Sequence, residues 1–312
     1  MSLIDVPPAN DHKILAGIIT YNPNTEALLA LIASLDCQPC NVIVLDNASE
    51  SQAQIQNISF RQNKVKFFSS KKNIGLAAAA NKIFAAGLAE GYDFVALFDQ
   101  DSLPEKNYLT VLESRYLEMS ASSDICVAAI AGAHTCNYSG AKAPFVRYDK
   151  FLPKKICPNN LRGSETFDFL ITSGCLFPLS VVKSAGFFDE TLFIDNVDVE
   201  WCCRVKSRGY KLVATNETSF SHSIGDEVYR CFGRIIARQH SPIRSYYSVR
   251  NLLALNKRNY VSRVWKFNAT IRAILKAIFI VTFSKNRLQY SREILRGIRD
   301  VKDIPLLPQY KK

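Results

Sequence analysis

The sequence predicts an α/β fold with a mainly parallel central sheet. Short apolar segments of strand length alternate with helical segments along the first hundred residues, and this alternation is typical of parallel strands joined by helices. The apolar segments are continuous, which indicates strands that are buried on both faces. Polar clusters follow several of these strands, and ligands of such sheets bind beyond the carboxyl ends of the strands.

The first hundred residues are expected to hold four strands and two helices. A buried strand, Ile14–Thr20, precedes a helix at residues 26–35, for which Asn24 or Thr25 supplies the N-cap. The Ala-rich segment Gly75–Ala89 has strong helix propensity. Because helices join successive strands, the crossovers should be right-handed and the strands parallel. The other strands are predicted at residues 42–45, 65–68 and 94–98.

The pattern changes after about residue 105. Residues 137–166 contain three prolines and are expected to form loops. From about residue 230 the chain is basic and is expected to be helical. Between these regions, strands are predicted at residues 125–133 and 210–214, an interrupted apolar segment at 167–177, and helices at 181–186 and 195–208.

The distribution of charge divides the chain into an acidic body and a basic tail. Residues 230–312 contain 19 Lys and Arg against 3 Asp and Glu, whereas residues 1–229 contain 20 against 25. With 48% hydrophobic and 21% charged residues, the composition is that of a folded protein rather than a disordered one. The basic tail indicates an anionic partner: phospholipid headgroups, a phosphate-bearing substrate or nucleic acid.

The most apolar segment of the tail, residues 271–283, contains Arg272 and Lys276, and it is shorter than the roughly 20 apolar residues of a membrane span. We expect either a helix lying on an anionic membrane surface or a helix packed on the rest of the protein. No signal peptide is visible, and the cysteines form no disulfide framework, so a cytoplasmic protein is expected. The apolar residues at helical spacing are Ile271, Ile274, Leu275, Ile278 and Val281.

The strongest chemical signal is Asp99-Gln100-Asp101, which follows a predicted strand. Two carboxylates at the end of a buried strand need a partner for their charge. Mg²⁺ or Mn²⁺ is such a partner, because hard cations bind carboxylate oxygens and can bridge a diphosphate. The alternative is a solvated turn, but the neighbouring polar clusters favour a metal site.

Two of those clusters are Thr20-Tyr21-Asn22 and Asp46-Asn47. The carboxylate of Asp46 can accept hydrogen bonds from a base or a ribose, or it can form an Asx turn. Asn73 and Gly75 stand at the start of a predicted helix, where a phosphate can bind. The sequence lacks the glycine patterns of dinucleotide-binding and P-loop proteins, which disfavours both classes.

Three acids, Asp195, Asp198 and Glu200, lie at the start of a predicted helix. One of them could be a general base that activates a hydroxyl nucleophile, or all three could simply favour the helix dipole. His222 becomes a candidate ligand if it faces the same metal as Asp101.

Taken together, these motifs resemble the family-2 glycosyltransferases with a GT-A fold, and among them the bacterial rhamnosyltransferases that use dTDP-L-rhamnose to build O-antigen and related polysaccharides. The resemblance covers roughly residues 12–255. Its motifs are Thr20-Tyr21-Asn22-Pro23, Leu45-Asp46-Asn47-Ala48-Ser49, Asn73-Ile74-Gly75-Leu76-Ala77, Phe98-Asp99-Gln100-Asp101-Ser102, residues 193–202, His222-Ser223-Ile224-Gly225-Asp226 and residues 244–251.

The resemblance implies a role for each motif. Asp198 would be the catalytic base, with Asp195 and Glu200 as alternates, because Val197 stands where the family has an acid. The metal ligands would be Asp99, Asp101 and His222. The donor-binding residues would be Thr20, Tyr21, Asn22, Asp46, Asn73, Gly75, Asp99, Arg250 and Asn251.

The implied activity is an inverting, metal-dependent transfer of a sugar to a hydroxyl of a saccharide acceptor that is lipid-linked. Residues 1–229 would form the catalytic domain, with the nucleotide-binding half at 12–105 and the acceptor-binding half at 106–229. Residues 230–312 would hold the protein on the cytoplasmic face of the inner membrane. Alternatives are transfer from another UDP-, GDP- or dTDP-sugar, a sugar-nucleotide pyrophosphorylase and a nucleic-acid-binding protein; no nucleic acid is expected as a partner.

Overall fold

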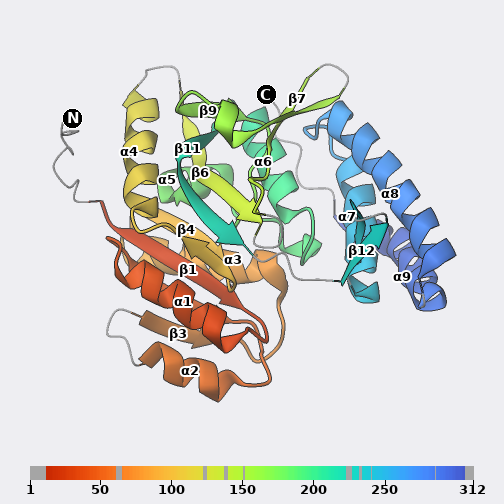
Figure 1. The fold of residues 1–312 in the computed structure, drawn as a ribbon, viewed down its shortest axis with the longest axis horizontal. Helices are drawn as coiled ribbons and strands as arrows, with labels where there is room; N and C mark the ends of the chain where they lie inside the picture. The colour runs from red at the N-terminus through yellow and green to blue at the C-terminus, as the bar shows by residue number, and fades with distance from the viewer. Residues whose placement is uncertain are drawn as a thin grey trace.

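The computed structural model describes residues 12–60, 65–121, 125–136, 140–149, 152–222, 227–231, 234–239, 241–284 and 286–305. A large mixed sheet with helices on both faces forms the body, and three helices from the end of the chain lie on one side of it (Figure 1). The predicted α/β class is therefore confirmed. The strand order is β3-β2-β1-β4-β10-β6-β11-β5, with β9 paired to β11.

The N-terminal half of the sheet is parallel, as predicted. Alternate residues of β1 point to opposite faces: Ile14, Ala16 and Ile18 pack with helix α1, whereas Leu15 packs with α3. The strands are β1 (Ile14–Thr20), β2 (Asn41–Asp46), β3 (Val65–Ser69) and β4 (Phe94–Asp99). The helices are α1 (Thr25–Asp36), the unpredicted α2 (Gln52–Phe60), and α3 (Gly75–Ala89).

The register of these strands aligns their carboxyl ends. Thr20 lies opposite Asp46, Asp46 lies opposite Ser69, and Ile19 lies opposite Asp99. The polar residues that end the strands therefore meet along one edge of the sheet, which we call the rim.

The second half of the sheet is mixed. Strand β10 runs antiparallel to both β4 and β6, and β11 runs parallel to β6 but antiparallel to β5. The β11–β5 register places His222 opposite Ser102, beside the rim. The elements are β5 (Ser102–Pro104), α4 (Tyr108–Ala121), β6 (Val127–Cys136), β10 (Cys175–Pro178), α5 (Leu179–Ala185), η2 (Glu190–Leu192), α6 (Val197–Ser207) and β11 (Lys211–His222).

Two predictions were wrong. Residues 137–166, expected to be loops, contain strands β7 (Phe145–Tyr148), β8 (Pro153–Ile156) and β9 (Ser164–Phe167), besides the short helix η1 (Pro158–Asn160). Pro153 is tolerated because it is the first residue of its strand, in a two-stranded ladder. The chain after residue 230 does not begin as helix: β12 (Glu227–Cys231) pairs with β13 (Arg234–Gln239).

The C-terminal helices complete the core of the body. Leu252, Leu255, Val261 and Trp265 belong to the same hydrophobic cluster as the residues that pack α3 on the sheet. Helix α8 presents a second, outward apolar face, and no helix in the described ranges is long and apolar enough to cross a membrane. The helices are α7 (Pro242–Asn256), α8 (Arg263–Phe283), α9 (Arg287–Asp300) and η3 (Val301–Asp303).

Candidate active site

The carboxylate of Asp46 is buried at the centre of the rim. It accepts hydrogen bonds from Thr20 Oγ1 at 2.9 Å, from the backbone N–H of Ser49 at 3.0 Å, and from the Ser49 hydroxyl. Through these contacts Asp46 stabilises the turn after β2, with a hydrogen bond to the N–H three residues on rather than the two residues of an Asx turn. In this structure Asp46 and Thr20 shape the floor of the rim and are fully buried themselves.

Tyr21 and Asn22 connect the loops that follow three strands. The backbone N–H of Tyr21 donates to Gln100 Oε1 at 2.8 Å, and that of Asn22 donates to Ser49 Oγ at 2.7 Å. Asn22 Oδ1 accepts the N–H of Glu50 at 2.9 Å. The ring of Tyr21 is exposed, so it can stack on a nucleotide base.

Asn47 and Asn73 join the turn after β2 to the start of α3. Asn47 Nδ2 donates to Asn73 Oδ1 at 3.0 Å, and Asn47 Oδ1 accepts the N–H of Ile74 at 2.8 Å. Gly75 has φ +84°, and a Cβ there would lie 2.6 Å from the ring of Phe193. Phe193 thus makes a close approach that requires a glycine at this position, and the binding of the donor by Gly75 stays a prediction.

Asp99 and Asp101 are half-buried residues at the end of β4. The backbone N–H of Asp99 donates to Ser173 Oγ at 3.0 Å, and this hydroxyl lies 2.8 Å from that of Ser102. The buried pair Ser102–Ser173, whose contact the sequence did not predict, therefore fixes the turn that carries both carboxylates. Small polar residues inside apolar segments were its only signal.

The side chains at this turn are of the kinds that bind a divalent cation. Two carboxylates stand one residue apart, and His222 lies in the strand paired with the residue after Asp101. The side chain of His222 and residues 223–226 of its motif lie outside the described part. Among the side chains that are described, no group of three His, Cys, Asp or Glu is close enough to hold a metal by itself.

Asp198 lies in the first turn of α6, facing the rim. Its Oδ1 accepts the N–H of Val199 at 2.8 Å, and its neighbours include the apolar side chains of Phe177, Phe188 and Trp201. Burial, together with the negative charges of Asp195 and Asp99, raises the pKa of Asp198 to about 7. The structure thus brings these three carboxylates together, and a carboxyl group with such a pKa suits general-base catalysis near neutral pH.

The turn before α6 carries Asp195 in a costly conformation. Phe193, Asp195 and Asn196 all have positive φ, at +64°, +64° and +62°. None is a glycine, and such a conformation costs on the order of 1–3 kcal/mol per residue. Asp195 is also ion-paired with Arg244, whose Nε lies 3.1 Å from Oδ1.

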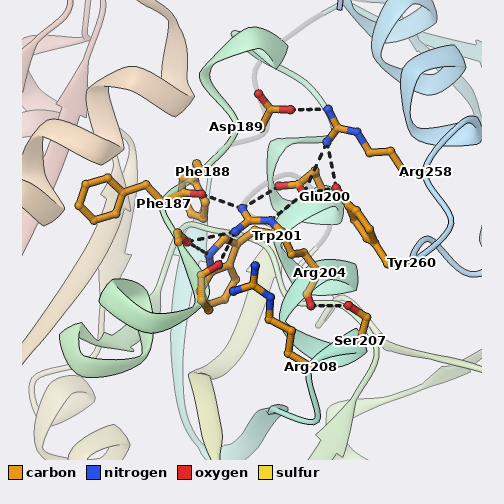
Figure 2. Close-up of polar contacts among 12 residues, drawn as sticks. Phe187, Phe188, Asp189, Glu200, Trp201, Arg204, Ser207, Arg208, Arg258 and Tyr260 are labelled. Atoms are coloured by element: carbon orange, nitrogen blue, oxygen red, sulfur yellow. Dashed lines mark hydrogen bonds and ion pairs between the residues drawn. The ribbon is translucent and has the colours of Figure 1, made fainter. Parts of the chain in front are cut away.

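Glu200, which the sequence offered as an alternate base, lies in a buried ionic cluster (Figure 2). Its carboxylate binds Nε and Nη2 of Arg204 at 2.8 and 3.0 Å and accepts the Tyr260 hydroxyl at 2.6 Å. Arg258 bridges Glu200 and Asp189. Because every oxygen of Glu200 has an internal partner, this residue is unsuited to proton transfer with a substrate.

Arg204 extends this cluster to the loop after α5. Its Nη1 donates to the carbonyl of Ala185 and its Nη2 to that of Phe187, both at 2.6 Å. The cluster therefore joins α6, the loop after α5 and the segment between α7 and α8. Arg258 and Asp189 lacked any sequence signal for this role.

Arg250 and Asn251 bind the turn before α6 in this structure. Asn251 is fully buried, and its amide donates to the carbonyls of Leu192 and Ile194 at 2.8 and 2.7 Å. Arg250 Nη2 donates to the carbonyl of Thr191 at 2.7 Å. Both residues contact the turn before α6, whereas the sequence analysis expected them at the donor.

Comparison with known proteins decides the family. Residues 16–173 match the profile of the family described as Glycosyl transferase family 2. The chain belongs to glycosyl transferase family 2. This family-2 transferase is 30% identical to the dTDP-rhamnosyl transferase RfbF of Shigella flexneri, over 93% of the chain and 96% of that protein. The predicted family, enzyme class and likeness to rhamnosyltransferases are confirmed.

Solved structures agree with the GT-A fold of this transferase. S. aureus TarS (residues 1–349), solved with UDP-GlcNAc, superposes with a TM-score of 0.57 at 15% identity, covering 93% of this chain and 80% of that one. GalNAc-T7, solved with UDP, GalNAc and Mn²⁺, gives a TM-score of 0.57 at 14% identity. The match covers 93% of the present chain but only 57% of GalNAc-T7, so this chain spans a little over half of that protein.

Removal of Glu200, the central acid of the buried cluster, should strongly lower the stability of the protein. Glu200→Ala leaves Arg204 and Arg258 without their shared counter-charge, which should lower the free energy of unfolding by about 3–5 kcal/mol. Glu90→Ala, which breaks the exposed ion pair with Lys66, should change it little. Urea denaturation followed by circular dichroism measures both, and equal effects of the two substitutions would contradict the assignment.

Proposed function

We propose that this family-2 transferase moves L-rhamnose from dTDP-L-rhamnose to a hydroxyl group of a saccharide acceptor, with inversion at the anomeric carbon. The observation that carries the proposal is the carboxylate of Asp198, half-buried beside Asp99 at the rim with a pKa raised to about 7 by burial. The rhamnosyl assignment is supported by the 30% identity to a dTDP-rhamnosyl transferase. Another UDP-, GDP- or dTDP-sugar is the alternative donor.

In the proposed reaction, Asp198 accepts the proton of the acceptor hydroxyl as its oxygen attacks the anomeric carbon. The nucleoside diphosphate leaves from the opposite face of the sugar, which inverts the configuration. Asp195 stays paired with Arg244, and its charge keeps the proton affinity of Asp198 high. Glu200 takes no part in this step, because its oxygens are bound within the buried cluster.

The metal site is proposed at Asp99, Asp101 and His222. Mg²⁺ or Mn²⁺ bound there would neutralise the charge of the departing diphosphate. The two carboxylates at the end of β4 and the strand pairing of His222 support this site. Tyr21, with its exposed ring, and Asn22 and Asn73 are proposed to line the nucleotide pocket, whose floor is shaped by Asp46 and Thr20.

Location at a membrane is proposed from the outward face of α8. Side chains three and four residues apart form one apolar stripe along this helix, and each of them is at least 40% exposed. An ordinary helix would pack such a stripe on the body. The stripe consists of Phe267, Ile271, Ile274, Leu275, Ile278 and Val281.

Basic residues accompany this stripe. Arg272 is exposed on α8, and on α9 the exposed residues Leu288 and Leu295 alternate with Arg292 and Arg299. Apolar and cationic groups exposed on these two helices complement an anionic bilayer. We therefore place the transferase at the cytoplasmic face of the inner membrane, where its saccharide acceptor is lipid-linked.

Asp198→Asn should lower kcat by about 10²–10⁴-fold, because an amide cannot accept the proton. Donor affinity should be preserved, since the substitution keeps the size of the side chain. In the wild-type enzyme, kcat should fall about tenfold per pH unit below pH 7, because only the deprotonated Asp198 is active and its pKa is raised to about 7. Transfer assays across pH 5–9 test both statements. Normal turnover by Asp198→Asn would contradict the assignment of Asp198 as the general base.

Asp101→Ala should abolish the dependence of donor binding on Mg²⁺ or Mn²⁺, because it removes a proposed metal ligand. The matched control is Asp93→Ala, an exposed acid before the opposite end of β4. Calorimetric titration with dTDP-rhamnose, with and without EDTA, measures the effect. If EDTA does not change the donor affinity of the wild-type enzyme, the proposed metal site is contradicted.

The double substitution Leu275→Glu/Ile278→Glu should abolish co-sedimentation with vesicles of anionic phospholipid, because it places charge in the apolar stripe of α8. Leu152→Glu, at an exposed leucine outside α8, is the control and should bind like the wild type. Binding should weaken as salt is added. A wild-type protein that stays in solution with anionic vesicles at low salt would rule out this location.

A further inference from the structure

The turn that leads into α6 has a backbone that its own sequence does not favour. Phe193 has φ +64° and ψ −67°, and the N–H of Ile194 donates to the carbonyl of Leu192 at 2.7 Å, which together form the strained type of γ-turn. Asp195 and Asn196 follow in the left-handed region. Since none of these residues is glycine, contacts from outside must hold the turn.

Those contacts come largely from one buried side chain. Asn251 Nδ2 lies within hydrogen-bond distance of three carbonyl oxygens, those of Leu192, Ile194 and Asp195, at 2.8, 2.7 and 2.8 Å. The carbonyl of Phe193 faces the other way and accepts the N–H of Ala77 in α3 at 3.3 Å. Asn251 and α3 thus hold the turn from opposite sides.

The amide of Asn251 is itself fixed in orientation. Its Oδ1 accepts hydrogen bonds from Nε and Nη2 of Arg250 at 3.1 and 2.9 Å, which leaves the NH₂ group directed at the turn. The guanidinium of Arg250 lies over the rings of Tyr246 and Tyr247, 5.2 and 5.0 Å from their centroids. Tyr247 in turn stacks on Phe193 at 4.7 Å, so the arrangement closes on the turn.

The turn determines where α6 begins. The carbonyl of Asn196 accepts the N–H of Glu200 at 3.0 Å, which is an early hydrogen bond of the helix, and Asp198 lies between these two residues. A shift of the turn would therefore move Asp195 and Asp198 together relative to Asp99.

We propose that Asn251 is a positioning residue for sugar transfer. Through the three carbonyls that it binds, it sets the position of Asp195 and of the first turn of α6, and so the placement of Asp198 against the rim. This inference rests on the proposed function, because it requires Asp198 to act in transfer. It replaces the donor contact that the sequence analysis expected of Asn251.

The decisive variant is Asn251→Asp, which keeps the size of the side chain but puts an oxygen where the NH₂ group faces three carbonyls. We expect kcat to fall at least tenfold, since small displacements of reacting groups lower rates by such factors, with KM for the donor changed less than about threefold. Asn256→Ala, on the same helix but bonded to Thr270, is the control and should match the wild type in both respects.

The possible outcomes distinguish a failure of the positioning role from a failure of the proposed function. Wild-type enzyme that transfers no sugar contradicts the proposed function itself. Active wild type, together with an unchanged kcat in a folded Asn251→Asp, overturns only the positioning role. If Asn251→Asp does not fold, Arg250→Met is the second variant, because it keeps Asn251 but removes the guanidinium that orients its amide. The same fall in kcat at near-constant KM is expected of it. A normal kcat in Arg250→Met overturns the inference.

Discussion

The carboxylate of Asp198 lies where burial disfavours its charge, although it must be charged to accept a proton. Burial and the nearby charges of Asp195 and Asp99 raise its pKa to about 7. Such a position costs free energy, and the contacts that fix α6 oppose any movement that would expose the group. The turn held by Asn251 fixes the start of this helix, and the buried cluster around Glu200 fixes its next turn to the loop after α5 and to the segment before α8.

The two buried networks show why acids close in sequence have separate roles. Asp198 and Glu200 are two residues apart on α6 and therefore face different sides of the helix. One side meets the rim and the other meets Arg204 and Arg258. The C-terminal region serves both sides, since α7 supplies Asn251 and the segment after it supplies Arg258 and Tyr260. The C-terminal region thus contributes to the core and the hydrogen bonding of the body.

Much of the fold followed from the sequence because continuous apolar segments ended by polar residues mark parallel strands; α3, for example, occupies Gly75–Ala89 as predicted. The hairpin β12–β13 was missed because its strands are short and lie in a region dominated by basic charge. The rim was predictable from strand ends alone. The role of Glu200 was not, because its partner Tyr260 is 60 residues away in the chain, and neither was that of Asn251, whose acceptors are backbone carbonyls that carry no residue-specific signal.

The most direct test of this account compares the free energy of unfolding of the wild type and Asp198→Asn between pH 4 and 8. The folded protein holds the proton of Asp198 up to a pKa of about 7, whereas the unfolded chain releases it near pH 4. The wild type should therefore lose stability relative to Asp198→Asn as pH rises from 4 to 7, and the difference should then stay constant. A difference that is independent of pH over this range would mean that Asp198 is not held in the desolvated position on which the mechanism depends.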